Sequence, residues 1–297
     1  MEDFEDLLQT PFEKLPKVDE IGPWSLVKLD IVKRYAEKYS LIIKQQQRFS
    51  HVYIDAFSGA GIAKLKKTEK YVLGSPLNAL NVSPPFDHYY FIDLDGEKID
   101  FLRDATKDRS NVSIEVGDCN SILLEKIFPK VKYTDFKRGL CLLDPYGLHL
   151  DWKVLLSAAS AKSIEVFINF PMMDINMNVL WRKNPEGQDP LQIERMNLFW
   201  GDDSWRDVAY DTESDLFGHP SKYYDSNRKI ALAFKDRLKK IAGFKHVPDP
   251  IPMRNTSQAE LYYLFFASHK KAGYDIARYL FEKYTKFGAS GWQQNQK

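Results

Sequence analysis

Cysteines and long apolar segments are scarce in this chain of 297 residues. Its two cysteines, Cys119 and Cys141, are too few for a cysteine-based zinc site or for the disulfide framework of a small secreted protein. No apolar run reaches the roughly 18 residues that would span a bilayer. The first residues, MEDFEDLLQTPFEK, are acidic and lack the basic-then-apolar order of a signal peptide. We therefore expect a soluble cytoplasmic protein without a membrane partner.

A strong excess of one charge is also missing, since 42 basic and 41 acidic residues leave a net charge of +1. A near-neutral chain has no overall attraction to nucleic acid or to a membrane, so any such attraction must come from a local patch. The six histidines are dispersed without the spacing of metal ligands, and we expect no metal site. With 44% hydrophobic residues, the chain can bury a sizeable core.

The first part of the chain alternates between predicted strands and helices. Residues 1–23 are expected to form a loose leader, and residues 24–47 have the apolar spacing of a helix. Strands are predicted at 51–57, 88–94, 111–117, 139–144 and 163–170, with helices at 75–82, 96–107, 120–128 and 151–159. Near-continuous apolar strands that alternate with helices are typical of a parallel sheet covered on both faces.

After Pro171 this alternation stops. Residues 172–220 are interpreted as an inserted helical lid, in which Trp200 and Trp205 are expected to pack rather than to stack on bases. A helix at 226–242, strands at 244–253 and 261–268, a helix at 272–286 and a flexible tail at 286–297 are expected to follow. We therefore predict an α/β, Rossmann-like class I S-adenosylmethionine (SAM) methyltransferase fold over residues 24–285. Its sheet is expected to be mostly parallel and seven-stranded, with a helical insertion.

A loop of small residues follows the first predicted strand, in the sequence YIDAFSGAGIA at residues 53–63. The candidate cofactor residues here are Asp55, Phe57, Ser58, Gly59 and Gly61. In an open parallel sheet a cofactor binds beyond the carboxyl ends of the strands. Glycines there let the backbone approach a ligand, whose carboxylate can meet backbone N–H groups. Lys64 replaces the third glycine of the dinucleotide fingerprint, which argues against NAD.

Acidic residues end the next two strands. In FIDLD, Asp93 is the first choice and Asp95 the second for accepting both hydroxyls of a ribose, and in GDCN, Asp118 beside Cys119 is placed to accept a hydrogen bond from an adenine amino group. Each feature alone has an ordinary alternative, which is a turn for the glycines and a helix cap for each aspartate. Because the features recur at consecutive strand ends, we favour a site for SAM.

Two further strand ends supply candidates for the chemistry. LLDPYG resembles the Asp-Pro-Pro-Tyr tetrad of amino-group methyltransferases with one proline fewer, so Asp144 is expected to orient an amino group and Tyr146 to stack on its base. The missing proline leaves N-methylation open. Asn169 is a third catalytic candidate, and Phe170 is a candidate wall of the substrate site. No Pro-Cys pair is present for cytosine-C5 methylation, and Cys141 is expected in the core.

A lysine-rich segment, IAKLKKTEKYVLG at residues 62–74, separates the glycine loop from the next helix. Two interpretations stay open: a solvated surface loop, or a flap whose Lys64, Lys66 and Lys67 grip the phosphates of a nucleotide or nucleic-acid substrate. Between Asp174 and Asp215, ten acidic and four basic residues give a net charge of −6. That charge would repel a phosphate backbone if it faced the substrate.

The order of YIDAFSGAGIA, GSPLNAL, FIDLD, GDCN, LLDPYGL and INFPMMDINMN resembles the three-Cys-motif partner protein family (TcmP). The resemblance covers about residues 24–285 and includes YYLFFASHKKAG near the end; NFPMMDINMN is its most specific piece, because no generic methyltransferase pattern predicts it. It implies a methyltransferase-like fold and association with a separate three-cysteine-motif protein of the iron–sulfur radical type. The resemblance supports the predicted fold and cofactor more strongly than it supports any particular substrate.

Functions from different classes therefore remain. The first is a SAM-dependent methyltransferase acting on an amino group of a nucleobase, with RNA or single strands favoured because a duplex base would have to be flipped out. The second is a SAM-binding partner that is active only in complex with a three-Cys-motif radical-type enzyme. Methyl transfer to a small molecule or a protein is a further alternative. The sequence indicates neither the substrate nor the oligomeric state.

Overall fold

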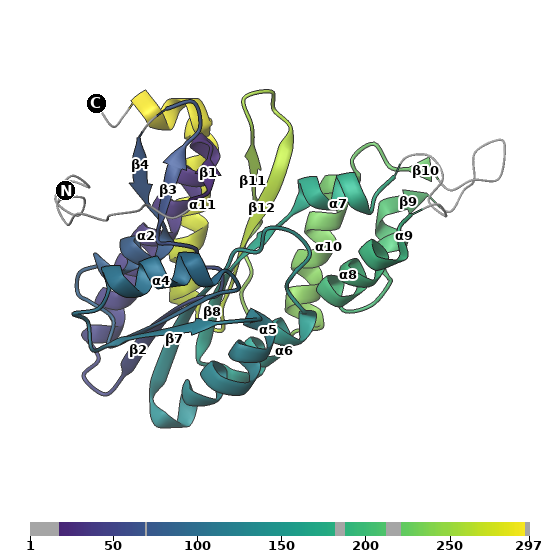
Figure 1. The fold of residues 1–297 in the computed structure, drawn as a ribbon. Coiled ribbons are helices and arrows are strands. Elements are labelled where there is room, and N and C mark those ends of the chain that lie inside the picture. Colours follow the sequence, from purple (N-terminus) through teal and green to yellow (C-terminus); the bar gives the residue numbers. More distant parts are fainter. Residues whose placement is uncertain (1–17, 69, 182–187, 212–220, 295–297) are drawn as a thin grey trace. The chain divides into compact units, whose positions relative to one another are not determined.

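The computed structural model describes residues 18–68, 70–181, 188–211 and 221–294 (Figure 1). The chain divides into two compact units, of which the first is Met1–Leu142 with Glu282–Lys297 and the second is Leu143–Phe281. None of the helices in the described ranges combines the length and the apolar character that crossing a bilayer requires.

Four parallel strands form the sheet of the first unit. β2 (Ser50–Asp55) lies between β7 (Lys137–Leu143) and β5 (His88–Asp93), and β6 (Val112–Val116) pairs with β5. Every residue of β2 after Ser50 is buried, which is the pattern of a strand covered on both faces. Cys141 is fully buried in β7, as predicted, and burial raises the pKa of its thiol well above the usual value.

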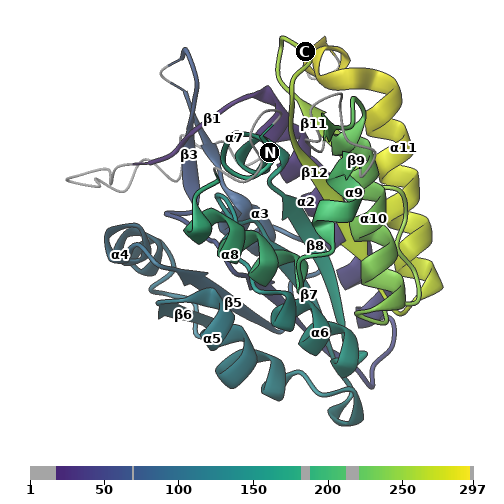
Figure 2. The same ribbon diagram turned by 90° about the vertical axis from the view of Figure 1, so that its right-hand side faces the viewer.

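Helices precede and follow the strands of this unit along the chain. α2 (Pro23–Lys44) buries Ile31, Tyr35 and Tyr39 along one face, so the predicted apolar stripe is the packed one. Figure 2 shows β5 and β6 side by side, with α4 (Gly96–Ala105) and α5 (Cys119–Ile122) beside them. The helix predicted at 120–128 is not regular: α5 continues as a π-helical turn η1 (Leu123–Ile127) and then as 3-10 turns η2 (Phe128–Lys130) and η3 (Tyr133–Asp135).

The lysine-rich segment is a β-hairpin rather than a loop, which corrects the sequence prediction. β3 (Ile62–Leu65) pairs antiparallel with β4 (Tyr71–Leu73), and α3 (Ser75–Leu80) follows. β1 (Glu20–Ile21), within the predicted loose leader, pairs parallel with β3 (Figure 1). The hairpin escaped prediction because its strands are short and its lysines mask the apolar alternation.

The second unit is built on three antiparallel strands. β12 (Glu260–Ala267) lies between β8 (Ile164–Phe170), which is buried along its whole length, and β11 (Ile251–Arg254). α6 (Trp152–Ala161) precedes β8, and α10 (Ser226–Lys240) precedes β11. An aromatic cluster centred on Phe234 fills the core of this unit, since its ring lies 4.7 Å from Phe170, 5.2 Å from Phe265 and 5.7 Å from Phe199, between ring centroids.

The insertion is mainly helical, as predicted, in its described residues. It contains α7 (Met172–Asn178), α8 (Pro190–Trp200) and α9 (Trp205–Ala209), followed by the short strands β9 (Tyr210–Asp211) and β10 (Ser221–Lys222). Trp200 and Trp205 are 1% and 0% exposed, so both pack inside the unit and neither is available to stack on a base. Of the lid residues, 182–187 and 212–220 lie outside the described ranges.

The last helix is longer than predicted. α11 runs over Lys271–Gln294, so residues 286–294, expected as a flexible tail, are helical, while 295–297 lie outside the described residues. The Tyr284 hydroxyl donates a hydrogen bond to Asp30 on α2, within the first unit. The predicted domain limits of 1–23, 24–285 and 286–297 stay a prediction.

The strand order of the main sheet is β11-β12-β8-β7-β2-β5-β6. The connections reverse direction at β2: β2 is followed by β5 and β6 on one side, and the chain then returns to β7 on the other. This order confirms the predicted α/β class, with a mostly parallel, Rossmann-like seven-stranded sheet. A ligand in such a sheet binds outside the carboxyl ends of the strands at the reversal, which here is the end of β2.

Candidate functional site

The loop after β2 has a backbone conformation that requires its glycines. Asp55 ends the strand with a fully buried side chain, and its Oδ1 accepts a hydrogen bond from Phe57 N at 3.4 Å. Gly59 and Gly61 have φ angles of +58° and +79°, in the left-handed region that favours glycine. A Cβ at Gly61 would lie 2.9 Å from Leu102 Cδ1, whereas the nearest atom to a Cβ at Gly59 would be 3.9 Å away. Gly61 is therefore tightly packed, and Gly59 has open space beside it.

The two aspartates at the end of β5, Asp93 in the strand and Asp95 after it, make different hydrogen bonds. Asp93 Oδ2 accepts a hydrogen bond from Gly59 N at 2.7 Å, and its Oδ1 accepts one from Asp95 N at 2.9 Å. Asp95 caps α4 by accepting hydrogen bonds from Glu97 N at 3.0 Å and Lys98 N at 3.3 Å. The cap interpretation therefore holds for Asp95, the second choice. Asp93 instead ties the end of β5 to the glycine loop and keeps lone pairs on both oxygens for a ligand.

Asp118, at the end of β6, is the N-cap of α5. Its Oδ2 accepts hydrogen bonds from Ser121 N at 3.0 Å and Ser121 Oγ at 2.9 Å, and its Oδ1 accepts one from Asn120 Nδ2 at 3.0 Å. Burial acts to raise the pKa of Asp118, but the hydrogen bonds from Ser121 and Asn120 outweigh it and lower the pKa. The carboxylate thus caps a helix, which was the alternative role considered from the sequence. Its contact with adenine stays a prediction. Cys119 beside it is buried at 5% exposure.

Further polar and apolar groups lie at these strand ends in the first unit, and of them sequence reasoning missed Leu94 and Val116. Ser58 Oγ is buried and has no hydrogen-bond partner within the described parts of the chain, so a polar ligand atom would satisfy it. Leu94 and Val116 are 76% and 48% exposed, although they are apolar and lie at the ends of adjacent strands. An apolar residue directly after the ribose candidate Asp93 was the available signal for Leu94. The first unit therefore offers one unsatisfied polar atom and two exposed apolar side chains to a ligand.

The predicted leader returns to the glycine loop. Asp19 Oδ2 lies 3.9 Å from the position of a Cβ at Gly59. Both Asp19 carboxylate oxygens accept hydrogen bonds from Lys98 Nζ, at 2.7 and 2.9 Å. The two residues of this ion pair are 79 positions apart, so no local pattern in the sequence predicts the contact.

In the second unit, residues 144–147 (the DPYG loop) lie against α7. Asp144 is partly exposed, and the Tyr146 side chain is 70% exposed, so its ring is accessible for stacking. A Cβ at Gly147 would lie 3.1 Å from Asp174 Oδ2, and Asp174 Oδ1 accepts a hydrogen bond from Asn178 Nδ2 at 2.8 Å. Asp174 therefore lies close against this loop, a contact that its place in the acidic insertion did not suggest.

The two candidates at the end of β8 have different surroundings. Asn169 is 8% exposed, and its Oδ1 has no hydrogen-bond partner in the described residues, so it offers a buried acceptor. Phe170 is fully buried, with its ring centroid 5.4 Å from that of Phe199 and 4.7 Å from that of Phe234. The predicted role of Phe170 as a substrate wall is wrong, because alternation along the strand directs its side chain into the aromatic core.

The candidate phosphate-binding lysines lie on the β3–β4 hairpin. Lys64 is in β3 and partly exposed, whereas Lys66 and Lys67 are exposed where β3 ends. Lys66 Nζ lies 5.8 Å from the centre of the Trp24 ring, and Lys67 has a φ of +62°. All three lysines thus lie on one hairpin, and their contact with phosphate stays a prediction.

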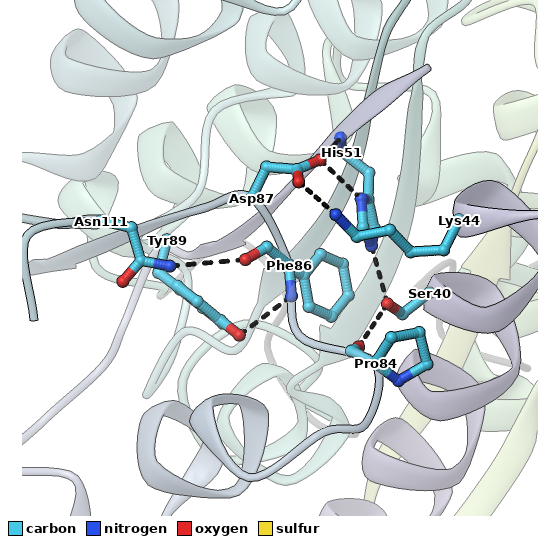
Figure 3. Close-up of polar contacts among 8 residues, drawn as sticks. All are labelled: Ser40, Lys44, His51, Pro84, Phe86, Asp87, Tyr89 and Asn111. Carbon is cyan, nitrogen blue, oxygen red and sulfur yellow. Dashed lines mark hydrogen bonds and ion pairs between the residues drawn. The ribbon is translucent and has the colours of Figure 1, made fainter. Parts of the chain in front are cut away.

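A Ser–His–Asp arrangement, in which the serine and the histidine are buried, was not anticipated from the sequence (Figure 3). Ser40 Oγ lies 2.7 Å from His51 Nε2, and His51 Nδ1 lies 3.0 Å from Asp87 Oδ2. Ser40 Oγ also donates to Pro84 O at 2.5 Å, and Lys44 Nζ pairs with Asp87. These distances match those of a hydrolytic triad, which is recognised by geometry rather than by sequence.

Burial excludes a hydrolytic role for this network. Ser40 and His51 are both 0% exposed, so no substrate carbonyl reaches the hydroxyl. The network instead joins α2, β2 and the segment before β5. Within the described residues there is also no group of three or more His, Cys, Asp and Glu side chains placed to hold a metal ion.

Comparisons with known proteins bear on the fold. No family model matches the chain, and no curated protein matches it. Protein LPL1258 from Legionella pneumophila, of family DUF519, superposes with a TM-score of 0.51 at 14% identity, covering 89% of this chain and 93% of that one. Trm1 from Pyrococcus horikoshii, solved with SAM, gives a TM-score of 0.44 at 11% identity over 86% of this chain and 58% of that one.

The methyltransferase domain of a bacterial Hen1 protein gives a TM-score of 0.37 at 11% identity, over 80% of this chain and 97% of that one. The descriptions of these two proteins, a SAM complex and a methyltransferase domain, apply to those proteins. The similarity at this identity concerns the fold alone. Membership of the three-Cys-motif partner family stays a prediction from the sequence.

Proposed function

We propose that this chain is a SAM-dependent methyltransferase, with its cofactor site in the first unit at the ends of β2, β5 and β6. The observation that carries the proposal is the position of Asp93, whose carboxylate binds the backbone of Gly59 at 2.7 Å where the strand connections reverse. This contact brings the acidic strand end and the glycine loop into one site. It is also compatible with ligand binding, because each carboxylate oxygen accepts more than one hydrogen bond.

Different residues of the first unit would bind different parts of the cofactor. Asp93 would accept the ribose hydroxyls, and Ser58 Oγ with the open backbone at Gly59 would meet the carboxylate of the methionine part. Leu94 and Val116 would cover the adenine, and the Asp118 carboxylate would accept a hydrogen bond from its amino group. Asp55, Phe57, Gly61 and Cys119 would form the wall behind the cofactor. When bound, SAM supplies a methyl group that is activated by its positively charged sulfur.

We infer that the acceptor is an amino group of a nucleobase, with RNA or single strands favoured. Asp144 is an acceptor for the amino hydrogens, the exposed ring of Tyr146 is available to stack on a base, and Asn169 Oδ1 is a second acceptor. Methyl transfer to an amine requires alignment and loss of a proton, so it does not depend on a strong base near Asp144. Lys64, Lys66 and Lys67 would contribute phosphate contacts.

A second candidate function is that of a SAM-binding partner that acts only in complex with a three-Cys-motif radical-type enzyme. The observation in its favour is on α7, the most specific part of the family resemblance, where Met173 and Met177 are 48% and 66% exposed. Residues four apart lie on the same face of a helix, and exposed methionines are frequent at binding surfaces. Copurification of the native protein, followed by a methylation assay with and without the copurified material, separates the two functions.

Calorimetric titration with SAM and with its demethylated product tests the cofactor site directly. We expect saturable binding of both to the isolated chain. Absence of binding at millimolar ligand, with the protein shown to be folded by circular dichroism, would end the proposal.

A further inference from the structure

A cavity of about 700 Å³ lies wholly within the second unit, outside the residues assigned above to the cofactor and the reaction. The residues that line it come from the end of α7, from the connection between β10 and α10, and from β12. Those used in the argument are Trp181, Lys222, Tyr223, Tyr224, Arg228 and Glu260. Its volume is within the usual range for small-molecule pockets, about 300–1,000 Å³.

Aromatic side chains on this cavity are unusually accessible. Tyr224 is completely exposed, and Trp181 is 39% exposed. Trp181 Nε1 donates to Met177 O at 3.1 Å, which fixes the orientation of the indole. The Tyr223 ring carries Lys229 Nζ 3.3 Å from its centre. Exposed aromatic rings next to positive charge are what single-stranded nucleic-acid sites use to stack bases.

The charges around the cavity favour an anion. Its carboxylates already have cationic partners, since Asp225 pairs with Lys229 at 3.5 Å and Glu260 with Arg254 at 2.7 Å. The Arg228 side chain is exposed, so its guanidinium is accessible to a ligand.

Lys222 adds a second cationic group to the lining, with its Nζ held 2.6 Å from Asn176 Oδ1 and 3.3 Å from Leu180 O. The start of α10 lies in the same wall, and the N-terminal end of a helix adds to the positive potential. The cavity thus combines aromatic surface with positive charge.

We propose that this cavity binds a nucleotide, with the base stacked on Trp181 and Tyr224 and the phosphate held by Arg228 and Lys222. The nucleotide is either free or one unit of a single strand. The inference goes beyond the proposed function, because the site would bind its ligand whether or not the first unit binds SAM. Nucleotide binding here would also let the second unit bind a single-stranded nucleic acid at a position away from the base that is methylated.

The test measures binding to the full chain without SAM, in two arms. Fluorescence anisotropy of a labelled 12-nucleotide single-stranded RNA covers the strand, and calorimetry with AMP, GMP, CMP and UMP covers the free nucleotide. We expect Tyr224→Ala to weaken binding by about 5- to 100-fold, as loss of one stacked base does. Arg228→Ala should lower the slope of log K against log salt for the RNA by about 0.7, the value for one phosphate contact on a single strand.

Matched controls are Tyr279→Ala and Arg195→Ala, which remove exposed side chains of the same unit that do not line the cavity. They should leave both affinities unchanged. Binding of RNA alone assigns the site to a strand, and equal binding of a mononucleotide assigns it to a free nucleotide. No binding in either arm, or equal losses in the control variants, overturns the proposal. Because SAM is absent throughout, failure here is separate from failure of the cofactor titration.

Discussion

Asp93 and Asp95 are two residues apart, carry the same side chain and have different roles. The sequence places an acidic residue at the end of β5, but it does not decide which of the two faces the glycine loop. That depends on where β5 ends and α4 begins, since Asp95 adopts the extended backbone of an N-cap and turns its carboxylate onto Glu97 N. The choice of Asp93 over Asp95 thus follows from a helix boundary, which sequence patterns locate poorly.

The Asp93→Ala variant should weaken SAM binding by about 1.5–3 kcal/mol, because it removes charge-assisted hydrogen bonds to the ribose. Asp95→Ala is the matched control, and it should lower stability by about 1 kcal/mol through loss of the helix cap while leaving the affinity unchanged. Calorimetric titration measures the first effect and urea denaturation the second. Equal losses of affinity in the two variants would contradict the assignment.

The glycine loop offers a second pair of variants. Gly59→Ala and Gly61→Ala both force a left-handed backbone on alanine, at about 1–2 kcal/mol each. Gly61→Ala should lose a further 1–3 kcal/mol or so by overpacking, because its Cβ would lie 2.9 Å from Leu102 and 3.0 Å from Leu77. Urea denaturation of both variants checks the difference. If Gly59→Ala proves the less stable protein, the packing described around Gly61 is wrong.

One buried and two half-buried histidines predict how the stability of the protein depends on pH. Burial lowers the pKa of His51 despite the opposing hydrogen bond to the Asp87 carboxylate, and the charge of Lys44 acts in the same direction as burial. Burial likewise lowers the pKa values of His88 and His269. These histidines bind fewer protons in the folded chain than in the unfolded one, whose value is 6.5. The free energy of unfolding should therefore be greatest above that pH and fall as the pH drops through it.

Denaturation in urea at pH 7.5 and again one to two pH units lower checks this sign. His51→Gln should remove part of the pH dependence, whatever its effect on stability at neutral pH. A protein that becomes more stable on mild acidification would contradict the neutral state assigned to these histidines.

At the scale of elements, the main strands were predictable and the small ones were not. β2, β5, β7 and β8 are nearly continuous apolar runs, and each was placed to within a few residues. β1, β3 and β4 are stabilised by pairing between the leader and the lysine-rich segment, a contact that no local pattern encodes. The aromatic core around Phe234 likewise depends on tertiary packing, which is why Phe170 was misplaced at the substrate site.

The contact between α7 and the DPYG loop predicts an effect on the reaction. Asp174→Ala should lower the rate of methyl transfer by about 10- to 100-fold, because small displacements of positioned groups have effects of that size. The affinity for SAM should not change, since α7 belongs to the second unit and the cofactor residues to the first.

Asp174→Asn, which keeps the shape of the side chain, should retain most of the activity. The control is Asp189→Ala, which removes the cap of α8 in the same insertion. Single-turnover methylation and calorimetry measure the two quantities separately. A loss of SAM affinity in Asp174→Ala that matches its loss of rate would show that the residue acts on overall folding.

At the scale of the whole molecule, the candidate groups divide between the two units. The first carries the residues proposed to hold SAM, and the second carries Asp144, Tyr146 and Asn169 together with the cavity proposed to bind a nucleotide. A near-neutral net charge of +1 gives the chain no general attraction to nucleic acid, so recognition has to come from such local groups. The fold and the residues at the strand ends could be predicted from the sequence, because both follow from the order of strands and loops along the chain.

Transfer of a labelled methyl group from SAM to RNA by the purified chain tests the central claim most directly. We predict that label enters total cellular RNA with the wild-type chain and is recovered in bases methylated on an amino group. We also predict that Asp144→Ala abolishes this transfer while calorimetry shows unchanged SAM binding. The contradicting result is a folded, SAM-binding chain that leaves RNA unlabelled both alone and with its copurified material, or an Asp144→Ala variant that methylates RNA at the wild-type rate.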